Sequence, residues 1–238
     1  MHPKVAKYAS SAVPRYTSYP AVPHWQTNLE PETYRGWLQR VDPTAPVSLY
    51  LHVPFCRELC WYCGCNMRLV SRYEPVAAYV ETLLLEVDRV CDALPGRVPV
   101  GHLHFGGGTP TSLTPDDLAR VMERLRERFE FLPDAEIAIE SDPRTLTAEM
   151  IDRIGALGFN RASFGVQEFS PEVQRAINRI QSEEMVRRAI DDLRAVGVNA
   201  INVDLIYGLP HQTAASLTRT IEACLAMTPD RLALFGYA

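Results

Sequence analysis

The sequence lacks the features that mark membrane, secreted and nucleic-acid-binding proteins. No stretch approaches the roughly 20 uninterrupted apolar residues that a membrane helix needs. The charged N-terminus has no apolar run behind it, unlike a secretory signal. The net charge of −5 over 238 residues is opposite in sign to the basic excess of a dedicated nucleic-acid binder, although a local basic pocket remains compatible with it. We therefore expect a cytoplasmic protein with no membrane span and no nucleic-acid partner.

The cysteines are too unevenly placed for a disulfide framework. Four of the six fall within ten residues: Cys56, Cys60, Cys63 and Cys65. A framework would spread its cysteines to join distant loops, so clustered thiols in a cytoplasmic chain indicate a metal or redox site. Cys91 and Cys224 stand alone in helical, largely apolar patterns, and we interpret them as small core residues.

Apolar runs alternate with amphipathic segments, which predicts an α/β fold with a parallel sheet and right-handed crossovers. Strands are expected at 47–53, 100–105, 136–140, 162–166, 200–206 and 231–237. Helices are expected at 75–91, 115–129, 148–157, 182–196 and 214–226. Thr114 and Ser170 each precede a proline as helix N-caps, and Gly158 and Gly197 supply left-handed caps at helix ends. The strands look buried on both faces, and periodicity alone leaves a barrel and an open doubly wound sheet as alternatives.

Two domains or segments are expected from the change in composition along the chain. Residues 1–46 are rich in proline, tyrosine and serine, which predicts an extended N-terminal arm with a short helix near 32–40. Residues 47–238 contain all the predicted strands. The last of them has no helix after it, so we expect a C-terminal domain to be missing from this chain.

The spacing Cys56-x3-Cys60-x2-Cys63 places three thiolates on one compact loop. Structural zinc sites usually use two separated Cys-x2-Cys pairs, and the sequence has no second pair. A thioredoxin-like pair of Cys60 and Cys63 would leave Cys56 unexplained. Three thiolates suit a four-iron, four-sulfur cluster with one iron open to another ligand. Cys65 is too close to Cys63 to share the same cube, so we assign it another role.

Further polar residues and glycines follow the predicted strands, where α/β folds build their sites. Glycines 106–108 and Thr109 either let a backbone approach a ligand or form a tight turn. Glu140 and Gln167 are placed to bind a ribose, an ammonium group or an adenine edge, although a solvated loop carboxylate is the plainer interpretation of Glu140. Arg179 and Asp204 suit the two charges of an amino acid, or else belong to structural ion pairs.

Several longer motifs carry a family resemblance. The stretch SLYLHVPFCRELCWYCGCN (48–66) resembles the radical S-adenosylmethionine (SAM) superfamily, and more narrowly the oxygen-independent coproporphyrinogen III oxidases (dehydrogenases) of heme biosynthesis. The match continues in PRYTSYP (14–20), HFGGGTPT (104–111), FGVQ (164–167), NR (178–179) and VDLIYGLP (203–210). Cys65 and the arm motif favour the oxidase over its relatives. The implied fold is a partial TIM-like (β/α)6 open barrel with parallel strands.

The resemblance also implies cofactors and roles. Cys56, Cys60 and Cys63 would hold a [4Fe–4S] cluster, and Cys65 would be catalytic. Two SAM molecules would be bound by Tyr50, Tyr62, Gly107, Gly108, Thr109, Glu140, Gln167, Arg179, Asp204 and Ala238. The second SAM molecule would lie near six of these: Gly108, Thr109, Gln167, Arg179, Asp204 and Ala238.

The implied reaction decarboxylates two propionates of coproporphyrinogen III oxidatively to give protoporphyrinogen IX. Arg15 in the arm is a candidate partner for the substrate carboxylates. The implied partners are an electron donor of the flavodoxin or ferredoxin type and no second copy, so a monomer is expected. A heme chaperone of the same superfamily, a non-catalytic iron–sulfur or zinc protein and an inactive fragment remain alternatives.

Overall fold

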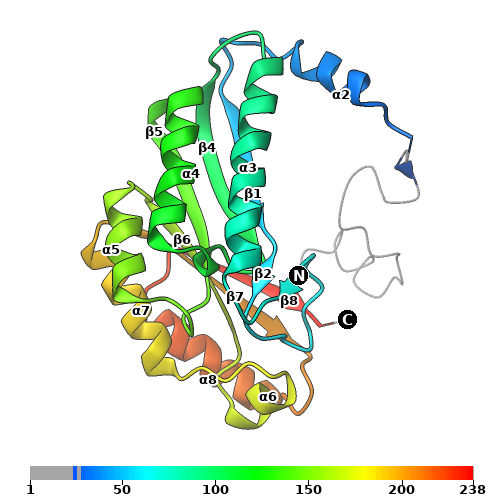
Figure 1. Ribbon diagram of the computed structural model, residues 1–238. Helices are drawn as coiled ribbons and strands as arrows, with labels where there is room; N and C mark the ends of the chain where they lie inside the picture. The colour runs from blue at the N-terminus through cyan, green and yellow to red at the C-terminus, as the bar shows by residue number, and fades with distance from the viewer. Residues whose placement is uncertain (1–23, 26–27, 238) are drawn as a thin grey trace, which may run out of the picture.

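The computed structural model describes residues 24–25 and 28–237, and a sheet of six parallel strands forms its centre (Figure 1). The strands lie side by side in chain order: β1 (Val47–Val53), β4 (Pro99–Gly107), β5 (Glu130–Ser141), β6 (Arg161–Gln167), β7 (Ala200–Tyr207) and β8 (Arg231–Gly236). Each crossover therefore advances by one strand in the same direction, and right-handed crossovers then place the connecting helices on one face. A doubly wound sheet reverses its strand order. The structure thus confirms the predicted partial (β/α)6 open barrel.

The connecting helices form a layer along the outer face of this sheet (Figure 1). They are α3 (Glu74–Ala93), α4 (Pro115–Arg128), α5 (Ala148–Ala156), α7 (Glu183–Ala195) and α8 (Ala214–Leu225). Three shorter helices are α2 (Pro31–Leu38), the 3-10 turn η2 (Pro110–Ser112) and α6 (Pro171–Ala176). Among the helices described, none combines the length and apolarity that crossing a bilayer requires. The arm motif at 14–20, Arg15 and Ala238 lie outside the described residues.

The helix ends follow the predicted capping pattern with one exception. The hydroxyl of Thr114 accepts a hydrogen bond from the amide of Asp117 (3.2 Å), as expected of an N-cap. Ser170 precedes α6, but its side chain makes no cap bond. Its own amide donates to the carboxylate of Glu168 (3.0 Å), which holds the chain where the helix begins but does not cap the first-turn amides. Two glycines have the expected left-handed backbone: Gly158 (φ 76°) and Gly197 (φ 96°).

The two faces of the sheet differ in polarity, and the expectation that both are buried is wrong. On the outer face, Phe105, Ile139 and Phe164 are fully buried in the core beneath the helices. On the inner face, Tyr50 is 58% exposed and His52 is partly exposed, because an open barrel with six strands leaves its concave side uncovered. Side chains that alternate with the core residues along each strand are therefore free to form a site.

A buried carboxylate anchors the chain where it leaves β6. Glu168 is 1% exposed, and its oxygens accept hydrogen bonds from the amide of Phe169 (2.9 Å), the side-chain amide of Gln212 (2.9 Å) and the hydroxyl of Thr220. Burial alone would raise the pKa of this carboxyl group. The hydrogen bonds outweigh that effect and hold the pKa of Glu168 below its usual value of 4.5.

We expect Glu168→Gln to lower the free energy of unfolding by about 1–3 kcal/mol at pH 7, since it leaves buried donors without an anionic acceptor. A depressed carboxyl pKa contributes stability above the unfolded-state value, and that contribution is lost as the pH falls through the folded-state value. The difference between variant and wild type in urea denaturation should therefore be largest above about pH 5 and shrink below 4.5. Glu184→Gln, an exposed change on α7, is the control, and a pH-independent difference would contradict the prediction.

Candidate active site at the carboxyl ends of the strands

A small parallel sheet holds the base of the loop that carries the clustered cysteines. Its two strands are β2 (Phe55–Cys56) and β3 (Arg68–Leu69). The amide of Arg68 donates to the carbonyl of Pro54 (2.6 Å), and the amide of Val70 donates to the carbonyl of Cys56 (3.0 Å). The loop between them, the cysteine loop (57–67), therefore leaves the barrel and returns to it at one place.

The far end of the cysteine loop is fixed to the connection between α6 and α7. The amide of Trp61 donates to the carbonyl of Ile177 (3.0 Å). The side-chain amide of Asn178 donates to the carbonyl of Leu59 (2.7 Å), and Asn178 adopts a left-handed backbone (φ 53°). In both contacts the loop contributes a backbone group, so its far end is tied to this connection through its main chain.

The cysteine loop closes over the inner face of the sheet and leaves a cavity of about 240 Å³, the inner cavity. Most of the predicted site residues line it: Cys56, Cys60, Tyr62, Cys63, Cys65, Gly107, Gly108, Thr109, Glu140, Gln167, Arg179 and Asp204. They come from the carboxyl ends of four neighbouring strands and from the loop. The structure thus brings together residues that are more than 100 positions apart in the sequence.

Two predicted residues are not placed in this lining. Ala238 lies outside the described residues. Tyr50 projects from β1 beside the cavity, where its ring stacks on that of His104 with centroids 5.9 Å apart and an interplanar angle of 12°. Its hydroxyl contacts Nδ1 of His52 (3.0 Å). Burial raises the pKa of Tyr50, and the charge of Glu140 adds to this effect.

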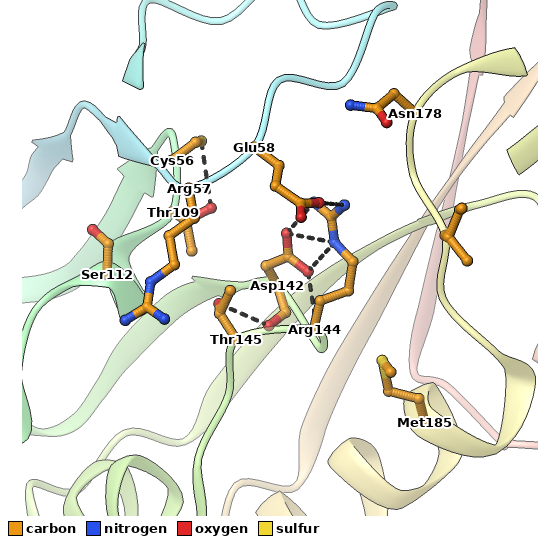
Figure 2. Close-up of a pocket in the computed structure, with 11 residues that line it drawn as sticks. Cys56, Arg57, Glu58, Thr109, Ser112, Asp142, Arg144, Thr145, Asn178 and Met185 are labelled. Atoms are coloured by element: carbon orange, nitrogen blue, oxygen red, sulfur yellow. Dashed lines mark hydrogen bonds and ion pairs between the residues drawn. The ribbon is translucent and has the colours of Figure 1, made fainter. Parts of the chain in front are cut away.

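Figure 2 shows the lining of a second cavity of about 460 Å³, the outer cavity. Five residues line both: Cys56, Glu58, Thr109, Asp142 and Arg144. In Figure 2, Glu58, Asp142 and Arg144 form one connected group, and Cys56 contacts Thr109, whose hydroxyl lies 3.6 Å from the sulfur. The two cavities are therefore neighbours that share part of their lining.

The four clustered thiols have different surroundings. A hydrogen bond from the side chain of Cys65 lowers the pKa of the Cys63 thiol to about 6, so Cys63 is the thiolate of this pair and Cys65 is the donor. The same contact raises the pKa of Cys65. Burial raises the pKa of Cys56. Cys60, the most buried of the four at 7% exposed, faces two guanidinium groups.

The donor set fits an iron–sulfur cluster. Cys56, Cys60 and Cys63 line one cavity, and thiolates are the soft ligands that such clusters use. Within the residues that the structure describes, no three His, Cys, Asp or Glu side chains are arranged to hold a single metal ion. Gly107 (φ 119°) and Gly108 form a glycine wall of the same cavity, and a Cβ atom at either position would meet the backbone of Val53 or Phe55.

Glu140 is held in one orientation by two contacts. Its Oε1 lies 3.1 Å from Nε2 of His104, and its Oε2 accepts a hydrogen bond from the amide of Gly107 (3.2 Å). Its side chain is 41% exposed, so it remains accessible from the inner cavity. Glu140 is therefore an oriented carboxylate of the site, and the plainer interpretation as a solvated loop residue is not needed.

Gln167 shows two signs of a ligand-binding residue. It ends β6 with a left-handed backbone (φ 66°), which is costly for a residue with a side chain and is concentrated at functional sites. Its Oε1 is buried and, among the described residues, has no hydrogen-bond partner. A buried acceptor without a partner is costly in a native protein, and a bound donor would remove that cost.

Arg179 and Asp204 line the same cavity but do not pair with each other in the part of the chain that is described. The ion pair of Arg179 is with Asp142, whose Oδ2 lies 3.4 Å from Nη1. Asp204 accepts a hydrogen bond from the side chain of Asn202 (2.9 Å), and burial raises its pKa. Arg179 thus belongs to a structural ion pair while also lining the cavity. Asp204 forms no salt bridge among the described residues, although the charge of Arg179 lies near enough to oppose the rise in its pKa.

Three residues of the site were missed from the sequence. His104 orients Glu140, and Asp142 and Arg144 form an ion pair beside Cys60. Asp142 and Arg144 directly follow β5, so the rule that selected Glu140 and Gln167 also applied to them. His104 stands two positions before Gly106, on the same face of β4, and the period of two along a strand was the signal for it.

Residues 50–224 match the radical SAM superfamily. An oxygen-independent coproporphyrinogen III oxidase of Bradyrhizobium diazoefficiens is 52% identical over 97% of this chain and 51% of its own length. The Escherichia coli enzyme of that name is 42% identical over 98% and 50%. The solved coproporphyrinogen III oxidase HemN of Escherichia coli, described as a radical SAM enzyme, superposes with a TM-score of 0.89 at 40% identity, covering 99% of this chain and 52% of that one. The chain spans about half the length of the curated relatives it matches.

Proposed function

The chain belongs to the radical SAM superfamily, and we propose that it is the barrel half of an oxygen-independent coproporphyrinogen III oxidase acting in anaerobic heme biosynthesis. The observation that carries the proposal is the inner cavity, which joins three loop thiols to a glycine wall and to unsatisfied polar groups. The substrate rests on the 52% identity to a relative of that name across nearly the whole chain.

The overall reaction removes carbon dioxide from two propionate side chains and leaves vinyl groups. In each round one hydrogen atom is removed from the β-carbon and one molecule of carbon dioxide is released. One electron passes to an external acceptor. When bound, the [4Fe–4S] cluster and SAM supply the reducing electron and the 5′-deoxyadenosyl radical that takes the hydrogen atom. The remaining task of the protein is to bind and orient the cofactors and the substrate and to exclude water.

Each residue of the inner cavity is assigned a role according to the chemistry of its side chain. Cys56, Cys60 and Cys63 hold the cluster and leave its fourth iron to a ligand that is not a protein side chain. Asp204 lines the cavity, forms no salt bridge with a described residue and suits the ammonium group of SAM, and Arg179 suits its carboxylate. The other proposed SAM contacts are Tyr50, Tyr62, Gly107, Gly108, Thr109, Glu140, Gln167 and Ala238. Two SAM molecules are proposed in all.

Cys65 is proposed to act on the substrate side of the reaction. Its side chain is exposed and lines the inner cavity. It stands two residues after Cys63, and the hydrogen bond to Cys63 raises the pKa of the Cys65 thiol. We also infer that residues 47–238 form the catalytic domain and that a further C-terminal domain covers the substrate. A flavodoxin- or ferredoxin-type donor would serve a cytoplasmic monomer.

The test is anaerobic reconstitution with iron and sulfide, followed by dithionite and SAM. We expect about four iron atoms per chain and release of 5′-deoxyadenosine. Zinc retention without SAM cleavage would overturn the assignment in favour of a structural metal protein. The substrate is tested with coproporphyrinogen III, using the chain joined to the C-terminal half of its Bradyrhizobium relative. Vinyl product supports the oxidase, whereas SAM cleavage with no vinyl product contradicts it and points to a heme chaperone.

A further inference from the structure

Arg144 and Asp142 form a buried ion pair (Figure 2), and Arg144 also contacts the sulfur of Cys60. Nη2 of Arg144 lies 2.6 Å from Oδ2 of Asp142 and 3.7 Å from the sulfur of Cys60. Nε of Arg144 donates to Oδ1 of Asp142 (3.0 Å), so the carboxylate holds the guanidinium through two of its nitrogens. On its other side, Nη1 of Arg144 donates to Glu58 (3.0 Å).

The burial and the shared contacts of this ion pair distinguish it from a chance surface pair. The side chains of Asp142 and Arg144 are only 9% and 13% exposed, and long charged side chains are rarely buried without a partner or a task. Asp142 also contacts Arg179, which donates through Nη1 to the same sulfur (3.4 Å). Two guanidinium groups therefore converge on Cys60, with one carboxylate between them that fixes their geometry.

The two cations have different roles in the site. Arg179 faces the inner cavity and is assigned above to the carboxylate of a ligand. Arg144 lines both cavities, is locked by Asp142 and Glu58, and contacts the sulfur. It therefore stays beside Cys60 whether or not a ligand engages Arg179.

Taking up an electron makes an iron–sulfur cluster more negative. Hydrogen-bond donors and positive charge at the ligating sulfurs stabilise that state and raise the reduction potential. Resting on the cluster assignment in the proposed function, we propose that Arg144, oriented by Asp142, is a positioning residue that holds the Cys60 thiolate and stabilises the reduced form of the cluster. Nothing in this role requires Arg144 to touch SAM or the porphyrinogen.

The test is a redox titration of the reconstituted protein, followed by the paramagnetic signal of the reduced cluster. In Arg144→Gln, we expect the ratio of reduced to oxidised cluster at a fixed poise to fall about tenfold, equal to about 59 mV for a one-electron couple. The matched control is Arg161→Gln. Arg161 is equally buried (11%) and pairs with Glu136 at 3.0 Å, but at the opposite end of the sheet. This control should titrate like the wild type.

Arg144→Lys keeps the charge but loses the planar fork that reaches both Asp142 and Cys60, so its potential should lie between those of wild type and Arg144→Gln. If Arg144→Gln retains no cluster, Arg144→Lys decides the question. A potential equal to that of the wild type in whichever variant retains iron overturns the proposal, as does an equal shift in Arg161→Gln. Failure of the wild-type chain to assemble a cluster would instead overturn the proposed function.

Discussion

Alanine in place of Cys56, Cys60 or Cys63 is expected to abolish cluster assembly, whereas Cys65→Ala is expected to leave the cluster in place. A cube held at three corners loses an iron as soon as one thiolate is missing. Cys65 supports Cys63 only by a hydrogen bond. In the first three variants iron should fall from about four per chain to nearly none, and SAM cleavage should vanish with it.

Iron analysis, the visible absorption of the cluster and release of 5′-deoxyadenosine measure these outcomes. Cys65→Ala should cleave SAM but fail in conversion of coproporphyrinogen when the chimaera with the C-terminal half is assayed. Cys91→Ala, a change on α3 away from the site, is the control for general effects of losing a thiol. Loss of iron in Cys65→Ala to the same degree as in Cys60→Ala would show that the ligand assignment is wrong.

Gly108→Ala is expected to displace the cysteine loop. A Cβ atom at position 108 would lie 2.7 Å from the carbonyl oxygen of Phe55 and 2.9 Å from its backbone nitrogen. These are backbone atoms at the start of β2, so no side chain can rotate away to relieve the clash. Overpacking of this kind costs about 1–3 kcal/mol in stability. A shift of about 1 Å at a reacting centre can cost about 100-fold in rate.

We therefore expect Gly108→Ala to unfold at lower urea concentration and to cleave SAM at least about 100-fold more slowly than the wild type. The matched control is Gly64→Ala, within the cysteine loop itself, where an added Cβ meets nothing within 4 Å. That variant should change the free energy of unfolding by less than about 0.5 kcal/mol. Equal behaviour of the two variants would refute the argument from backbone contact.

The sequence predicted the elements of this fold better than their arrangement. Strand β1 occurs at the predicted bounds, and the other strands extend the predicted ranges or shift them by a residue. The choice between an open barrel and a doubly wound sheet depends on strand order, which periodicity does not contain. The burial of both faces was predicted wrongly because the polar residues alternate with large apolar ones, and the core face dominated the pattern.

The sequence predicted most of the residues of the candidate site but not the contacts between them. The cysteines could be selected because they cluster in sequence, and Gln167 because it follows a predicted strand. Asp204 lies within the predicted strand 200–206 and was selected for its charge, opposite to that of Arg179, and through the family resemblance. The ion-pair partner of Arg179 could not be predicted, because Asp142 lies 37 positions away in the sequence. The adjacency of β5 and β6 in the sheet brings the two segments together. The cap expected at Ser170 is also absent: its side chain makes no cap hydrogen bond, although its own amide is held by Glu168.

The parallel pairing of β2 with β3 has a consequence for repair of the protein after oxidation. Many small metal-binding modules are unfolded until the metal arrives, and binding energy is consumed in ordering them. Here the backbone bonds of Arg68, Val70 and Trp61 fix the loop independently of the thiols. We therefore expect the cysteine loop to stay folded when oxidation by air removes the iron. Amide hydrogen exchange at Val70 should be as slow before reconstitution as after it, and resupply of iron, sulfide and reductant is then enough to restore the centre.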